Sequence, residues 1–362
     1  MQGRGRITSI FGLVLIGCGG GGAQGDESST GGAASTGGVS STGGTGEVPT
    51  TGGSSESTGA VDPCLGSPQA LADCVDPAAY RSDLEFIADL RVPGTPHWQE
   101  VQDLCADRLS EYGYQVALQD YGTGVNVVGR KLGSKPGQVV VGAHYDHIEG
   151  CHGADDNASG VAATLEIARL LALPGFEQTV LIACWDEEED GLIGSEAYVA
   201  AAQAAKDEIL INYNFDMIGF RSDEANSQTV PEGFSLVFSK EYNEIEANAF
   251  RGDFIAAVAS SLAHDRALEY KAAAERVGLK IAVLELPAGT ENTATFDDLR
   301  RSDHASFWQA GYPAVFLTDT GEFRNQHYHC MGGPDEVEDL DLEFAVAVTK
   351  ATVEASAVAA GM

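Results

Sequence analysis

The sequence has little positive charge. Its 362 residues include 21 Lys and Arg against 54 Asp and Glu, which gives a formal net charge of −33 at pH 7. A chain this acidic repels nucleic acid and anionic lipid, so neither is expected as a partner. Long apolar runs are lacking as well. No stretch between Val61 and Met362 approaches the roughly 18 consecutive apolar residues that a membrane-spanning helix needs.

The first 60 residues are set apart from the rest of the chain. Residues 1–18, MQGRGRITSIFGLVLIGC, place two arginines before a short apolar stretch, which is typical of a signal peptide. The ending Leu-Ile-Gly-Cys resembles a bacterial lipobox and predicts lipidation of Cys18; the alternative is an ordinary cleaved signal. Residues 19–60 are rich in Gly, Ser and Thr and are predicted to be a disordered tether. We therefore expect an exported cell-envelope lipoprotein.

Seven cysteines are present. With Cys18 assigned to lipid, an even number is left for an oxidising compartment. Cys64 and Cys74 flank a short loop that contains proline, and we expect them to pair. The remaining four can pair in three ways or stay free: Cys105, Cys151, Cys184 and Cys330.

Helix-like and strand-like patterns alternate along residues 61–362. Apolar residues at helical spacing predict helices at 83–91, 96–114, 158–173, 194–205, 251–270, 302–311 and 340–360. Short apolar runs predict strands at 124–133, 137–146, 178–186, 208–219, 279–286 and 313–320. This alternation predicts one α/β domain with a mostly parallel central sheet and helices on both faces.

Polar side chains gather where the predicted strands end. His144, the five acids at 186–190, Asp216 and Asp319 each follow an apolar run. Open α/β sheets bind their ligands beyond the carboxyl ends of the strands, so these side chains are expected to form one site.

The first two clusters have a metal interpretation and a structural one. His144 in AHYDH has Asp146 two residues on, the pattern of a metal ligand oriented by a carboxylate, although it could be a buried histidine with no metal. Asp155 and Asp156 in GADDNASG could be ligands or could cap the helix that follows.

The later clusters add acids and imidazoles. In WDEEED the like charges repel, and a bound cation would relieve this repulsion while a second carboxylate accepts a proton from water. Asp216 lies at an apolar strand end, where an unpaired carboxylate is costly. RNQHYHCMGGPDE supplies His327 and His329. Mixed nitrogen and oxygen ligands favour zinc, with manganese or cobalt less suitable. Two ions bridged by one carboxylate would use five such ligands.

In chain order, AHYDH, GADDNASG, EEEDGLIGS, NFDMIG, RSDHASF and YHCMGGPDE resemble the motifs of the co-catalytic zinc aminopeptidases. This family includes secreted bacterial leucine aminopeptidases and has carboxypeptidase Q-like and glutaminyl cyclase relatives. The resemblance covers residues 80–360. It implies a three-layer α/β/α zinc exopeptidase fold and the hydrolysis of N-terminal peptide bonds.

The resemblance also assigns roles by position. One ion would be held by His144, Asp216 and a bridging Asp155, and the other by Asp155, Glu189 and His329. Glu188 matches the general base, with Glu187 as an extra acid that could shift this alignment by one residue.

Further positions follow from the same motifs. Asp146 matches the carboxylate behind the first histidine ligand, and His327 competes with His329 for the last ligand position. Tyr328 matches an oxyanion contact. Arg301, next to Arg300, matches a substrate contact.

Other polar residues near these motifs have no expected role in the reaction. Asp303 and His304 are expected to be structural, and His147 and His152 are expected to take no part. A Cys151–Cys330 disulfide, similar to those near the last histidine of some relatives, is an open possibility.

The implied substrates are peptides with a free N-terminus, whose amine would be held by acids around Asp216 and Glu188. A glutaminyl cyclase, a carboxypeptidase-type enzyme and a non-catalytic surface binding module are the alternatives. We expect a monomer whose only membrane contact is an N-terminal lipid.

Overall fold

The computed structural model describes residues 62–362. The expected signal peptide at 1–18, the lipidation of Cys18 and the tether at 19–60 lie outside the described residues. Among the residues that are described, no helix combines the length and the apolar character that crossing a membrane requires.

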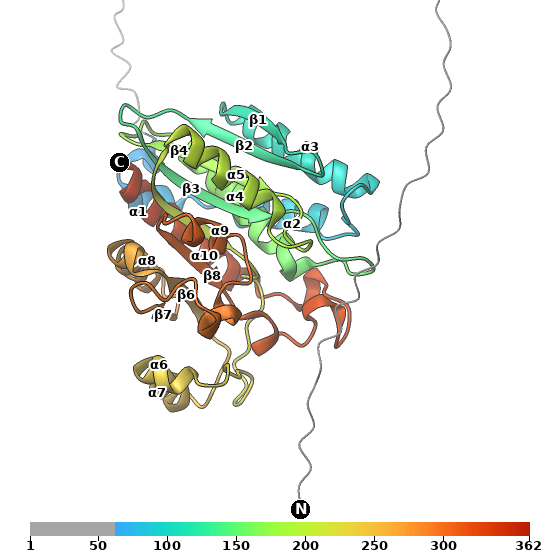
Figure 1. Cartoon of the computed structure of the whole chain (residues 1–362), viewed down its shortest axis with the longest axis vertical. Coiled ribbons are helices and arrows are strands. Elements are labelled where there is room, and N and C mark those ends of the chain that lie inside the picture. Colours follow the sequence, from blue (N-terminus) through green and yellow to red (C-terminus); the bar gives the residue numbers. More distant parts are fainter. Residues whose placement is uncertain (1–61) are drawn as a thin grey trace, which may run out of the picture. The chain divides into compact units, whose positions relative to one another are not determined.

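A mixed eight-stranded sheet forms the centre of the domain (Figure 1). Its strands, in their order across the sheet, are β1 (Gln115–Asp120), β2 (Val125–Lys131), β4 (Thr179–Trp185), β3 (Gly137–His144), β5 (Glu208–Phe215), β8 (Ala314–Thr318), β6 (Ile255–Ala259) and β7 (Ile281–Glu285). Neighbours from β4 to β8 run parallel, as do β6 and β7. The β1–β2, β2–β4 and β8–β6 pairs are antiparallel. The predicted α/β class is confirmed, with the parallel strands concentrated in the middle.

Helices cover both faces of this sheet (Figure 1). One face packs against α1 (Pro68–Asp73), α2 (Pro77–Ile87), α3 (Pro96–Glu111), α4 (Gly160–Leu171), α8 (His264–Arg276) and α10 (Leu342–Ala360). The other packs against α5 (Ile193–Ala205), α6 (Phe234–Val237), α7 (Ser239–Ala247) and α9 (His304–Gln309). Strand β4 serves both layers because successive side chains point to opposite faces: Ile182 enters the first core and Leu181 the second.

The helix predicted at 251–270 is wrong in its first half. Residues 255–259 form strand β6, and helix α8 begins only at His264. All five strand residues are buried, with β7 on one side and β8 on the other. Three of the five are alanines, whose helix propensity is outweighed by burial and strand pairing. Strand β1 and helices α1, α6 and α7 were not predicted from the sequence.

The strand register brings the polar segments together. His144 at the end of β3 pairs with Trp185 at the end of β4. Ala143 of β3 pairs with Phe215 at the end of β5. The chain therefore leaves all three parallel strands at the same edge, and the residues that follow them converge there.

Two disulfides are present among the described residues. Cys64 pairs with Cys74, as predicted, and Cys151 pairs with Cys330. Cys105 and Cys184 are buried free thiols. The second disulfide joins the loop after β3 to the loop that carries His329.

Candidate metal centre

The side chain of His144 faces three carboxylates. Its Nε2 atom lies 3.4 Å from Asp156 Oδ1, 3.7 Å from Asp216 Oδ1 and 4.0 Å from Glu188 Oε2. Its Nδ1 atom lies 3.4 Å from Asp146 Oδ1 on the opposite side of the ring. The position expected for Asp146, behind the first histidine, is the one observed.

Asp156, rather than Asp155, lies between the two histidines. Its Oδ2 atom is 3.3 Å from His329 Nε2, while its Oδ1 atom faces His144. The Asp155 carboxylate is turned away and accepts hydrogen bonds from the Gly219 amide and the Asn325 side chain, both at 2.8 Å. The position between the histidines expected for Asp155 is thus corrected by one residue. These two hydrogen bonds satisfy the Asp155 carboxylate outside the cluster.

Asp146 fixes the two acids that follow β4. Its carboxylate accepts hydrogen bonds from the backbone amides of Glu188, at 3.0 Å, and Glu189, at 3.2 Å. Both of these side chains point to the cluster. Glu187 instead accepts a hydrogen bond from Thr123 Oγ1 at 2.6 Å, and Asp186 accepts one from Trp98 Nε1 at 2.7 Å. Only the second and third glutamates of the acidic run therefore reach the site.

The last histidine of the cluster is His329. Its Nε2 atom lies 3.2 Å from Glu189 Oε2. His327 points elsewhere, with Nδ1 3.0 Å from Asp339. His147, which we expected to take no part, is buried in the cluster with Nδ1 2.8 Å from Glu189 Oε1. Asp216 directly follows β5, as expected, and faces His144, whereas Glu189 faces His329. Asp156 faces both histidines and so joins the two parts of the cluster.

The electrostatics of this cluster fit a bound cation. Burial disfavours a charged His144, but the neighbouring carboxylates, above all Glu188, raise the pKa of His144 well above its usual value. Burial raises the pKa of Glu188. The buried Nε2 atoms of His144 and His147 have no hydrogen-bond partner, although carboxylates surround the cluster. Imidazole nitrogen and carboxylate oxygen are the donors that zinc takes in hydrolytic sites, so the residues fit such an ion.

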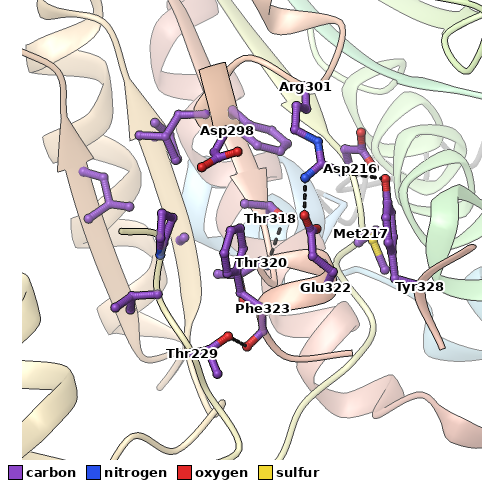
Figure 2. Close-up of a pocket in the computed structure, with 18 of the residues that line it drawn as sticks. Asp216, Met217, Thr229, Asp298, Arg301, Thr318, Thr320, Glu322, Phe323 and Tyr328 are labelled. Carbon is purple, nitrogen blue, oxygen red and sulfur yellow. Dashed lines mark hydrogen bonds and ion pairs between the residues drawn. The ribbon is translucent and has the colours of Figure 1, made fainter. Parts of the chain in front are cut away.

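Five residues of the cluster line a pocket, and Figure 2 labels one of them, Asp216. The pocket has a volume of about 860 Å³, its open mouth included. The cluster residues in its wall are Asp156, Glu188, Glu189, Asp216 and His329. The remaining wall is largely apolar and comes from the strands β6, β7 and β8 and from the segment before and within α6 and α7: Val230, Phe234, Ile245, Phe254, Ala256, Val258, Ala282, Leu284 and Phe316.

Arg301 and Tyr328 lie together on the polar wall of this pocket (Figure 2). Arg301 Nη2 donates a hydrogen bond to Tyr328 Oη at 2.8 Å, and Nη1 forms an ion pair with Glu322. Tyr328 also stacks on His329, with ring centroids 3.9 Å apart. Arg300 is absent from the wall and pairs with Asp297. Glu322 was not anticipated from the sequence, where it is one more acid in a loop.

Asp303 and His304 are both fully buried. Neither Asp303 oxygen has a hydrogen-bond partner, and burial raises the pKa of this carboxyl to about 7. His304 stacks on Phe316 and donates a hydrogen bond from Nε2 to the Leu299 carbonyl oxygen, which suits the structural role expected of it. Burial lowers the pKa of His304 to about 3, so the ring is neutral.

Comparison with known families gives a match over most of the domain. Residues 126–355 match the model of peptidase family M28. The chain belongs to this family. The matched residues include every histidine and carboxylate of the cluster, and the family resemblance expected from the motifs is thereby confirmed.

Individual relatives of this chain share shorter segments with it. An uncharacterized Escherichia coli protein, YfbL, is 32% identical over 206 residues, 54% of this chain and 59% of its own length. LpqL of Mycobacterium tuberculosis, described as a probable lipoprotein aminopeptidase, is 43% identical over 163 residues, 41% of this chain and 30% of its own length. The chain thus spans less than two thirds of these curated relatives.

Solved structures share the fold at low sequence identity. LapA of Legionella pneumophila aligns with a TM-score of 0.63 at 20% identity, covering 82% of this chain and 76% of LapA. A glutaminyl cyclase from Fimbriiglobus ruber aligns with a TM-score of 0.55 at 15% identity, covering 79% of this chain and 96% of its own. These alignments support the fold class alone.

Proposed function

We propose that this M28 chain is an aminopeptidase that uses two zinc ions to hydrolyse N-terminal peptide bonds. The observation that carries the proposal is the double cluster: two groups of histidine and carboxylate share Asp156 and open onto one pocket. The aminopeptidase names of relatives such as LpqL support it.

Each ion would be held by three side chains. His144, Asp216 and Asp156 would hold one, and Asp156, Glu189 and His329 the other. His147 would support Glu189 through the 2.8 Å contact. When bound, such ions supply Lewis acidity toward the scissile carbonyl and make a water molecule easier to deprotonate. Manganese or cobalt would be weaker matches to this donor set.

Glu188 is the proposed general base. Of the three carboxylates that face His144 Nε2 it is the most distant, at 4.0 Å, and its amide is anchored on Asp146. It would take a proton from the attacking water and return it to the leaving amine. Asp146 would keep both His144 and Glu188 in place for this transfer.

The pocket suggests how a peptide would be held. The apolar wall would take a hydrophobic side chain of the first residue, and the cluster acids in the pocket wall would hold its α-amine. Arg301 and Tyr328 would contact the peptide at the polar wall, with Tyr328 close enough to His329 to reach a developing oxyanion.

A peptide panel tests this function. We expect hydrolysis of aminoacyl peptides with a hydrophobic first residue, none of N-acetylated ones, and loss of activity with a chelator that zinc restores. Glu188→Gln should lower kcat by about 10²–10⁴-fold with two zinc ions still bound. Glu187→Gln is the matched control, because Glu187 faces Thr123, and should stay near the parent kcat.

Two results would contradict the proposal. Cleavage of N-blocked or C-terminal residues would indicate a different exopeptidase. One zinc ion per chain, with cyclisation of N-terminal glutamine, would indicate a glutaminyl cyclase.

We also propose that the chain is a monomer held at the cell envelope by lipid on Cys18, with peptides as its substrates and no nucleic-acid partner. The lipoprotein description of LpqL supports the location.

A further inference from the structure

The segment that carries Asp156 is buried, although it lies in a loop. It runs from Gly153 into the distorted turn Ala154–Ser159, all of it buried. Buried peptide groups need hydrogen-bond partners, and an irregular loop cannot supply all of them itself. Two charged side chains from distant parts of the chain supply partners here.

Arg91 binds the carbonyl groups of this segment. It lies between α2 and α3 and is fully buried. Its Nη2 atom donates to the carbonyl oxygens of Gly153, at 2.7 Å, and Asp156, at 2.9 Å. Its Nη1 atom donates to the carbonyl of His152. One guanidinium group therefore binds three carbonyl groups, two that precede Asp156 in the chain and that of Asp156 itself.

Asp335 binds the amide groups of the same segment. Its carboxylate accepts hydrogen bonds from the amides of Asp155, at 3.0 Å, and Asp156, at 3.1 Å. Its backbone carbonyl accepts a third, from Ala154, at 3.3 Å. Asp335 is 1% exposed and follows the loop of His329, so it ties the two loops of the cluster together.

The segment has no room for an alternative path. A Cβ atom on Gly153 would come within 2.1 Å of the Asp156 carbonyl oxygen, and Gly153 has a φ of +59°. The Asp156 carbonyl is therefore closed in by Gly153 on one side and by Arg91 on the other.

We propose that Arg91 and Asp335 are positioning residues that hold the Asp156 carboxylate between His144 and His329. The proposal rests on the function proposed above, because it concerns the binding of the same two ions. Neither side chain is a ligand. Arg91 acts on the carbonyl groups and Asp335 on the amide groups, so the peptide planes around Asp156 cannot rotate. Because Asp156 is shared, both ions depend on the pair.

The test is the zinc dissociation constant of the full-length chain, measured by competition with a chromophoric chelator, together with kcat and KM. Changing residues that orient ligands typically weakens metal binding 10–100-fold. Arg91→Met should weaken binding of both ions within that range and lower kcat more than it changes KM. Arg91→Lys should bind zinc more tightly than Arg91→Met and less tightly than the parent, because the ammonium group keeps the positive charge but lacks the several donors of a guanidinium group. Asp335→Asn should act in the same direction.

Arg169→Met is the matched control. Arg169 also joins distant segments, by hydrogen bonds to Glu166 and to the Cys74 carbonyl, but it does not contact the cluster. The Arg169→Met variant should have a lower free energy of unfolding than the parent and the same zinc affinity.

Parent-like zinc affinity in Arg91→Met and Asp335→Asn, with only the unfolding midpoint lowered, would overturn the positioning role. If Arg91→Met does not fold, the zinc affinities of Arg91→Lys and Asp335→Asn test the positioning role instead. A parent chain that binds no zinc would instead overturn the proposed function, so the two failures are distinguishable.

Discussion

Asp155 and Asp156 are adjacent in the chain, yet their carboxylates have different surroundings. Asp155 accepts hydrogen bonds from Gly219 and Asn325, and burial and the nearby Asp319 raise its pKa well above the usual value. Asp156 faces His144 and His329. Proximity in sequence thus says little about which of two carboxylates serves a site.

Asp156→Asn should remove zinc binding, because a shared ligand is lost from both groups. We expect both dissociation constants to rise by more than about 100-fold, beyond the effect typical of residues that only orient ligands. Asp155→Asn should keep zinc affinity near the parent value and lower the free energy of unfolding by about 1–3 kcal/mol, because a buried hydrogen bond is disturbed. Equilibrium dialysis and urea unfolding would measure these effects. If Asp155→Asn weakened zinc binding and Asp156→Asn did not, Asp155 would be the shared ligand.

The sequence predicted the residue types of the site better than their directions. His144, Glu188, Glu189, Asp216 and His329 each follow an apolar run or lie in a motif, and the structure brings them together. The choice between Asp155 and Asp156 depends on backbone direction within one distorted turn. No pattern of residue types encodes that direction.

At the scale of elements, the Cys151–Cys330 disulfide connects two loops of the site. One follows β3 and leads to Asp156, and the other carries His329 directly before Cys330. The bond spans 179 residues of sequence, whereas Cys64–Cys74 spans 10 and lies near α1. The long-range disulfide therefore fixes the His329 loop to the loop that follows β3.

Replacing both Cys151 and Cys330 with serine should weaken the group formed by Glu189 and His329 more than the group around His144. We expect about 10-fold weaker binding of one zinc ion and little change for the other, because only the His329 loop is released. Replacing Cys64 and Cys74 with serine is the control and should leave both affinities unchanged. Zinc titration monitored by calorimetry would separate the two binding steps. Equal weakening of both steps would contradict this account.

Element prediction from sequence failed where burial overrides local preference. Residues 255–259 are alanine-rich, which favours a helix, but two neighbouring strands pair with them. The contribution of Arg91 was missed for a related reason. A single arginine between two helices gives no signal until the fold brings distant carbonyls to it.

At the scale of the whole molecule, the proposed lipid on Cys18 would hold the chain at a membrane. Cys18→Ser should move the protein from the membrane fraction to the soluble fraction of cells, because lipid would no longer be attached. The kcat should not change, since the proposed ligands all lie between residues 144 and 329. Fractionation with immunoblotting, and labelling with a fatty-acid analogue, would measure this. Finding the unaltered chain in the soluble fraction would contradict the proposed lipid anchor.

The order of residues along the chain separates two parts of the site. Most of the apolar pocket wall lies between residues 230 and 316, after Asp216 and before His329, in a stretch that contributes no proposed zinc ligand. If the proposed function holds, substitutions of the apolar wall residues in that stretch would change which first residue fits without replacing a proposed ligand. The substrate range of such an enzyme would then be free to diverge during evolution while its chemistry stays constant.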